Sequence, residues 1–152
     1  MSNLVTILVC LTLVSRVWAT EKVVPVASLP KPVLSKVSSK YPEAKIFNAE
    51  EEIEAGKTTY EVALSDKGTK LQIVLDAAGE VLAIEKEIPI DSIPKVVLDG
   101  LHAKYPKASI AMAEEITKSS KITYEIKINK ADEKKTEVTF DDAGRFIEEE
   151  AQ

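Results

Sequence analysis

The chain carries an internal repeat, and this repeat constrains the fold more than any other feature. Four short landmarks occur twice in the same order, three at an offset of 64 residues and the last at 65. The pairs are Ser28-Leu29-Pro30 with Ser92-Ile93-Pro94, Lys40-Tyr41-Pro42 with Lys104-Tyr105-Pro106, Thr59-Tyr60-Glu61-Val62 with Thr123-Tyr124-Glu125-Ile126, and Asp76-Ala77-Ala78-Gly79 with Asp141-Asp142-Ala143-Gly144. This order indicates a duplication. We therefore expect two copies of one small unit, at residues 28–87 and 91–150.

Each copy opens with a helical pattern of apolar residues. The stripes are Val33, Val37 and Tyr41 in the first copy and Ile93, Val97, Leu101 and Tyr105 in the second. Recurrence every four residues is typical of one face of an amphipathic helix. We expect Ser28 and Ser92 to be the N-caps, with Pro30 and Pro94 in the first turn. The proline that follows each tyrosine should end each helix at or before that tyrosine.

The rest of each copy alternates between apolar and polar residues, as strands do. Tyr60, Val62 and Leu64 alternate with Glu61 and Ala63, and the second copy repeats this pattern. Glycine-containing turns separate the strands. The predicted fold class is α+β, with two tandem helix-plus-four-stranded antiparallel repeats. Because about 60 residues alone bury little surface, the copies should share a core or form one continuous sheet backed by helices.

The first 19 residues resemble a signal peptide. The run from Leu4 to Val14 is almost purely apolar, and Val17-Trp18-Ala19 suits signal peptidase cleavage before Thr20. The run is too short to span a membrane as a helix. The alternatives are a buried N-terminal helix or a retained anchor; a lipid anchor on Cys10 is disfavoured because small residues do not precede it. We expect an exported protein, periplasmic or secreted, with no stable membrane anchor after cleavage.

The composition excludes several classes of function. With 45% hydrophobic and 30% charged residues, the chain is typical of soluble globular proteins. Its formal net charge is −5, and loss of Arg16 with the signal peptide makes it one unit more negative. An acidic, mixed-sign chain argues against nucleic acid and anionic membranes as partners. Cleavage also removes the single cysteine, and with it any thiol nucleophile, thiolate ligand or disulfide.

Few residues suggest catalysis or metal binding. His102 is the sole histidine, flanks an apolar stripe, and is interpreted as a helix-surface residue because a general base needs convergent partners. Asp76, Asp141 and Asp142 could be calcium ligands, but a calcium site needs six or more oxygens, so turn capping is the favoured interpretation. We predict no enzyme activity, no cofactor and no metal site.

Three acidic runs remain, at residues 50–52, 114–115 and 148–150. Charge runs on strands usually form solvated faces or protect sheet edges. A specific binding role is the alternative.

Each copy resembles the PepSY-like domain. The resemblance rests on the strands Tyr60-Glu61-Val62 and Tyr124-Glu125-Ile126 and on the Asp-x-x-Gly turns within residues 74–82 and 139–147. The tandem arrangement is similar to the β-lactamase inhibitor protein architecture, which implies helical segments behind an antiparallel sheet whose open face grips an enzyme. That inhibitor's disulfides have no counterpart in this sequence. The resemblance implies a binding role, with inhibition of a peptidase or another hydrolase as one form of it.

The predicted function is therefore an exported, non-catalytic module that binds an extracytoplasmic protein or peptide. The candidate surface is the sheet face turned away from the core, with Glu61, Gln72, Val74, Glu125, Lys127, Glu137 and Thr139. An exposed sheet edge could also add a peptide strand. The alternative is an envelope protein that binds a small ligand or a divalent cation through its acidic strand ends.

Overall fold

The computed structural model describes residues 20–132 and 134–151, so the predicted signal peptide at residues 1–19 lies outside the described residues. The elements are β1 (Thr20–Val23), η1 (Val26–Ser28), α1 (Lys31–Lys40), β2 (Lys45–Glu54), β3 (Lys57–Asp66), β4 (Thr69–Asp76), β5 (Val81–Glu87), η2 (Ile90–Ser92), α2 (Lys95–Lys104), β6 (Ser109–Lys118), β7 (Lys121–Asn129), β8 (Lys135–Asp141) and β9 (Phe146–Ala151). No helix in this part of the chain has the length and apolar character that a membrane span requires.

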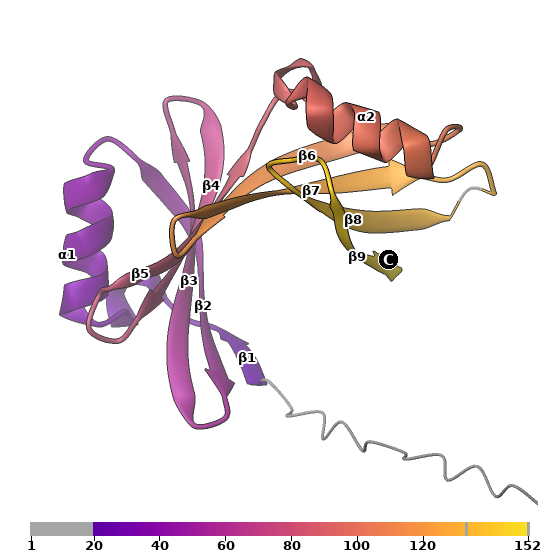
Figure 1. Cartoon of the computed structure of the whole chain (residues 1–152). Coiled ribbons are helices and arrows are strands. Elements are labelled where there is room, and N and C mark those ends of the chain that lie inside the picture. Colours follow the sequence, from indigo (N-terminus) through magenta and orange to yellow (C-terminus); the bar gives the residue numbers. More distant parts are fainter. Residues whose placement is uncertain (1–19, 133, 152) are drawn as a thin grey trace, which may run out of the picture.

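The strands form one nine-stranded antiparallel sheet in which each strand pairs with the next along the chain (Figure 1). The predicted fold class, two helix-plus-four-stranded repeats, is therefore wrong. β5 pairs with β6 from Ala83 opposite Lys118 to Glu87 opposite Glu114, which removes the two edges that separate units would leave exposed. β1 adds a ninth strand beside β2, from residues that precede the predicted first repeat.

The two helices lie where the apolar stripes predict them, but both predicted N-caps are wrong. Ser28 lies in η1, and Pro30 occupies the N-cap position of α1 with ψ 140°. Pro94 does the same for α2, after Ser92 in η2. The residue before each proline is extended, with ψ 144° at Leu29 and 129° at Ile93, as a following proline favours, so neither residue belongs to its helix. The predicted helix ends are confirmed, since the tyrosine that follows each helix is its C-cap.

The four strands expected after the helix of each copy correspond along the chain to β2–β5 and to β6–β9. Burial alternates along β4, β7 and β8, as the alternating residues predicted. What alternation does not encode is which strand lies beside which.

The sheet carries two separate hydrophobic cores, not a shared one. The first core packs α1 against β2, β3 and β4, and its buried residues are Leu29, Val33, Val37, Ala49, Val62, Leu64, Leu71, Ile73 and Leu75. The second packs α2 against β6, β7 and β8, with Ile93, Val97, Leu101, Ala113, Tyr124, Ile126, Ile128, Val138 and Phe140. We call β1–β5 with α1 the first half, and β6–β9 with α2 the second half. The β5–β6 pairing joins them.

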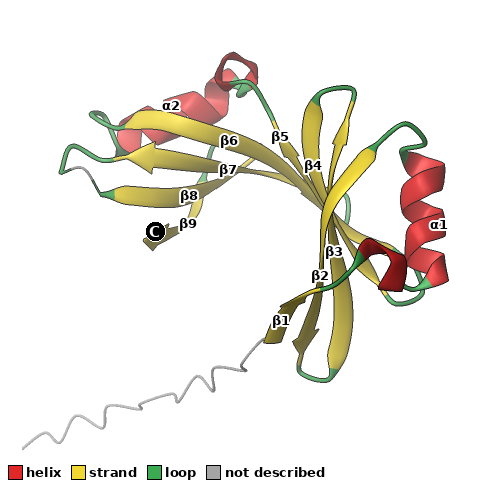
Figure 2. Cartoon of the chain, turned by 180° about the vertical axis from the view of Figure 1, so that it is seen from behind, coloured by secondary structure: helices red, strands yellow, loops and turns green. Residues whose placement is uncertain are grey.

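Both helices cover the same face of the sheet. Ile84 packs against the first core and lies opposite Thr117 of β6, which by alternation shares its face with buried Ala113 of the second core. In Figures 1 and 2 the strands of the two halves run at a steep angle to each other, with each helix on the outer side of its own half. We call the opposite, helix-free side the open face.

The two Asp-x-x-Gly turns are capped by their aspartates and pack closely against the helices. Asp76 Oδ1 accepts hydrogen bonds from the backbone N–H groups of Ala78 and Glu80, both at 2.9 Å. Asp141 Oδ1 caps the second turn in the same way. The turn-capping interpretation of these two aspartates is thus confirmed. Gly79 has φ +81°, and a Cβ there would stand 2.7 Å from the carbonyl oxygen of Pro32 in α1.

Candidate partner-binding face

The seven residues predicted to form a binding surface all lie on the open face. Their strands alternate, and the neighbouring Val62, Ile73, Ile126 and Val138 are buried on the helix side. The register places the predicted residues opposite one another in cross-strand pairs: Glu61 with Val74, Glu125 with Thr139, and Lys127 with Glu137. Each pair, however, belongs to a single half of the molecule.

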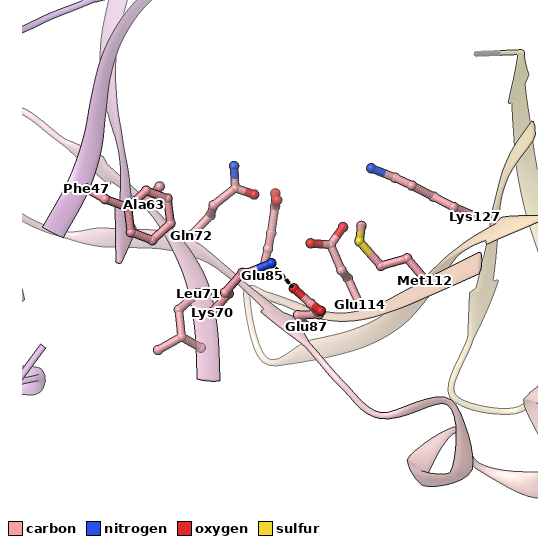
Figure 3. Close-up of a pocket in the computed structure, with 10 residues that line it drawn as sticks. All are labelled: Phe47, Ala63, Lys70, Leu71, Gln72, Glu85, Glu87, Met112, Glu114 and Lys127. Carbon is pink, nitrogen blue, oxygen red and sulfur yellow. Dashed lines mark ion pairs between the residues drawn. The ribbon is translucent and has the colours of Figure 1, made fainter. Parts of the chain in front are cut away.

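The β5–β6 pairing brings the two halves of the open face together. Gln72 of β4 lies opposite Glu85 of β5, and Glu87 of β5 lies opposite Glu114 of β6. Figure 3 shows Gln72, Glu85 and Glu114 reaching into a common space, with Lys127 extending toward it from the second half. Sequence reasoning missed Glu85 and considered Glu114 only as part of an acidic run, because it did not fix the pairing of β5 with β6.

Polar contacts on the open face link neighbouring strands. Gln72 Nε2 donates a hydrogen bond to Glu61 Oε1 at 2.5 Å. Lys127 Nζ lies 3.4 Å from Glu137 Oε2, and Lys70 Nζ lies 3.3 Å from Glu87 Oε2. These two lysines offset only part of the negative charge that gathers here.

The carboxyl groups at the centre of this face hold their protons more tightly than usual. Burial, followed by the negative charges of neighbouring carboxylates, raises the pKa of Glu85. Burial also raises the pKa of Glu114, against the opposing effect of Lys127. The pKa of Glu125 rises to about 7, because burial is joined by the charge of Glu137 and a hydrogen bond to it. The charge on the open face therefore changes near neutral pH.

An exposed aromatic residue adds an apolar element that the sequence analysis also missed. Phe47 is 62% exposed and sits where the β2–β3 register shifts between Ile46 and Asn48. It lines a hollow of the open face with Ala63 and Gln72 (Figure 3). A bulge places two residues of one strand against one of its partner and re-aims a side chain. The only signal in the sequence was two consecutive apolar residues that interrupt the alternation.

A larger hollow, of about 650 Å³, is lined by both halves. Its charged lining residues are Glu52, Glu54, Glu61, Glu85, Glu125 and Glu148 together with Lys57 and Lys118. Acidic side chains thus dominate it. The shape and charge fit a basic, protruding surface better than a flat or acidic one.

The acidic runs of the sequence are divided between the two faces. Glu114 lies on the open face, whereas Glu115 accepts a hydrogen bond from Tyr124 at 3.5 Å. Likewise Glu51 accepts one from Tyr60 at 3.2 Å. The runs therefore serve both as partners of the strand tyrosines and as open-face charges.

The other chemical candidates do not converge on a site. His102 is exposed on α2, as expected for a helix-surface residue. Across residues 20–132 and 134–151, no group of three or more His, Cys, Asp or Glu side chains is arranged to hold a metal ion. Asp142 is exposed in its turn. The open face is the feature that gathers polar, charged and exposed apolar side chains from both halves.

Comparison with known proteins identifies the family. The model of the family described as "Putative beta-lactamase-inhibitor-like, PepSY-like" matches residues 16–83 and 72–148. No curated protein matches the chain in sequence.

Solved structures share the fold. A "putative periplasmic" protein from Bacteroides eggerthii is 14% identical, with a TM-score of 0.69 over 80% of this chain and 88% of its own. A DUF2874 family protein from Bacteroides uniformis is 14% identical, with a TM-score of 0.68 over the same shares. A BLIP-like protein from Bacteroides fragilis is 18% identical, with a TM-score of 0.62 over 80% of this chain and 86% of its own. The family match spans most of the sequence, so the chain belongs to the beta-lactamase-inhibitor-like, PepSY-like family.

Proposed function

We propose that the chain is an exported, non-catalytic binding protein whose open face engages another protein. One observation carries the proposal: a helix-free sheet face combines Phe47, 62% exposed on a β-bulge, with acidic hollows lined from both halves. Exposed aromatic residues set in a polar surround are typical anchors of protein interfaces. A face assembled from strands of two halves offers a broad surface, as a protein partner requires.

Two further observations support export and a binding role. The sequence carries a predicted signal peptide, and a solved structure of the same fold is described as "putative periplasmic". Another is described as BLIP-like. Inhibition of an extracytoplasmic hydrolase is one form that binding at this face could take.

The negative charge of the open face indicates which kind of partner surface would bind it. Its hollows are predominantly acidic, with Lys70 and Lys127 each set beside a glutamate. We expect the partner to present lysine or arginine residues, with an apolar contact for Phe47. Electrostatic complementarity of this kind raises the association rate and makes it sensitive to salt.

The test is a crosslinked affinity capture from an extracytoplasmic extract, with bait that begins at Thr20. The open-face variant is Phe47→Ala, and the matched control is Ile90→Ala, which removes an apolar side chain of 45% exposure from η2. We expect one saturable partner whose recovery falls about tenfold with F47A, as for an anchor worth about 1.4 kcal/mol, and not with I90A. Absence of a saturable partner, or equal losses with both variants, would overturn the proposal.

The alternative of cation binding is not favoured by a specific observation, since the described residues contain no metal-holding group.

A further inference from the structure

The junction between the two halves has an unusual composition on the open face. Glu87 of β5 lies opposite Glu114 of β6, and Glu114 in turn lies opposite Glu125 of β7. Three glutamates thus stand side by side on three adjacent strands. Like charges directly opposite each other in an antiparallel sheet destabilise the pairing.

Neighbouring groups increase the negative charge around this row. On the open face, β8 contributes Glu137, whose charge raises the pKa of both Glu114 and Glu125. β5 also contributes Glu85 and β3 contributes Glu61, and the charges of Glu61 and Glu114 raise the pKa of Glu85. Lys127 of β7 and Lys70 of β4 oppose them, and each lies beside a glutamate, Glu137 and Glu87 respectively. From β9, Glu148 and Glu150 pair with Thr139 and Glu137.

Apart from the strand pairing, two isoleucines hold the junction: Ile84 packs against the first core, and Ile88 packs against the second and donates its backbone N–H to the carbonyl oxygen of Ala113. The hydrophobic cores are separate clusters on either side of it. Across the β5–β6 boundary there are five residue pairs, among them Ile84 opposite Thr117 and Lys86 opposite Glu115 on the helix side. Within the two cores, buried apolar side chains reinforce the pairing of β2, β3 and β4 and of β6, β7 and β8. At the junction, the backbone hydrogen bonds and the two flanking isoleucines resist the repulsion of the glutamate row.

We propose that the glutamate row at the β5–β6 junction is a pH-sensitive seam, which is tight when Glu114 or Glu125 is protonated and loosens when both are ionised. Loosening allows the two halves to change their relative orientation and so changes the shape of the open face. This property belongs to the chain itself and does not depend on a bound partner.

The direction in which stability changes with pH follows from the protonation states of Glu114 and Glu125. Burial and neighbouring carboxylates raise the pKa of Glu114, and they raise that of Glu125 to about 7. Unfolding returns both to ordinary values near 4.5. The folded chain then binds more protons than the unfolded chain between about pH 4.5 and 7, so this contribution to stability declines as pH rises through that window.

The test compares Glu114→Gln, Glu125→Gln and the double variant with Glu43→Gln, an exposed control outside the sheet. Glutamine keeps the shape of a protonated glutamate. We expect E114Q and E125Q each to raise the melting temperature at pH 8 by about 1–5 °C, and by less at pH 5.5. Because the two carboxylates face each other, the double variant should gain less than the sum of the single variants.

Amide hydrogen exchange on the unmodified protein tests the location. After correction for intrinsic exchange rates, protection of the β5–β6 amides should fall between pH 5.5 and pH 8 more than that of the β2–β3 amides. The inference is wrong if both strand pairs lose protection equally, or if E114Q and E125Q show the same pH dependence of melting as E43Q. The exchange measurement decides the matter even if a variant fails to fold.

Discussion

Gly79 is the position at which the helix–sheet contact of the first half can be tested most sharply. It has φ +81°, and a Cβ at this position would stand 2.7 Å from the carbonyl oxygen of Pro32 and 2.8 Å from its carbonyl carbon. The obstacle is helix backbone, which cannot rotate away. Gly68, in the neighbouring turn, has φ +87° but nothing within 4 Å of the same atom. The two glycines therefore share the backbone requirement and differ in the packing.

The expected magnitudes follow from these two terms. An alanine in the left-handed region costs about 1–2 kcal/mol, and this applies to Gly68→Ala and Gly79→Ala alike. Overpacking against the helix adds about 1–3 kcal/mol at Gly79 only. We expect losses of about 1–2 kcal/mol for G68A and about 2–5 kcal/mol for G79A. The larger value is a substantial fraction of the total stability of a domain.

The assay is equilibrium urea unfolding of both variants beside the unmodified protein. At an unchanged m-value, the unfolding midpoint should fall further for G79A than for G68A. Gly144→Ala should resemble G79A, because its Cβ would stand 2.2 Å from the carbonyl oxygen of Val96. Equal midpoints for G68A and G79A would refute the reasoning, since they would show that the turn does not pack closely on α1.

Three further predictions concern the whole protein. Burial is the largest of the causes that raise the pKa values of all four tyrosines. Absorbance titration of the folded protein should therefore give a midpoint above that of the urea-unfolded chain, and the free energy of unfolding should fall as pH rises above about 10. Coincident titrations of the folded and unfolded chains would contradict this. Leu64 and Phe140 are fully buried, one in each core, so Leu64→Ala and Phe140→Ala should each lower the free energy of unfolding by about 2–5 kcal/mol. The double variant should lose the sum of the two values because the cores are separate. Marked non-additivity would indicate a shared core. Millimolar calcium should leave the melting temperature unchanged, because the described residues hold no metal-binding group, whereas a concentration-dependent rise would favour the cation-binding alternative.

Much of the local structure could be predicted from the sequence because it depends on nearby residues. The four-residue spacing of Val33 and Val37 placed α1, and the alternation around Val62 placed β3. The Asp-x-x-Gly turns could be interpreted because a single aspartate side chain caps each one. The N-caps were misplaced because in each copy the proline itself, two residues after the serine, occupies the N-cap position.

The overall fold and part of the site could not be predicted in this way. Pairing of β5 with β6 depends on backbone hydrogen bonds, which leave no side-chain pattern, and it alone places Glu85 near Glu114. The four residues of β1 are too few to show alternation. Phe47 reaches the open face through a bulge, and a bulge breaks the rule on which strand prediction relies.

The most direct test of the account is site-specific photocrosslinking to the captured partner. A photoreactive residue is placed at Phe47 or Gln72 on the open face, and at Ser35 or His102, both exposed on the helices, as controls. We predict crosslinks from the two open-face positions and none from the two helix positions. Crosslinks from the helix positions alone would contradict the central claim, because they would place the partner on the opposite side of the sheet.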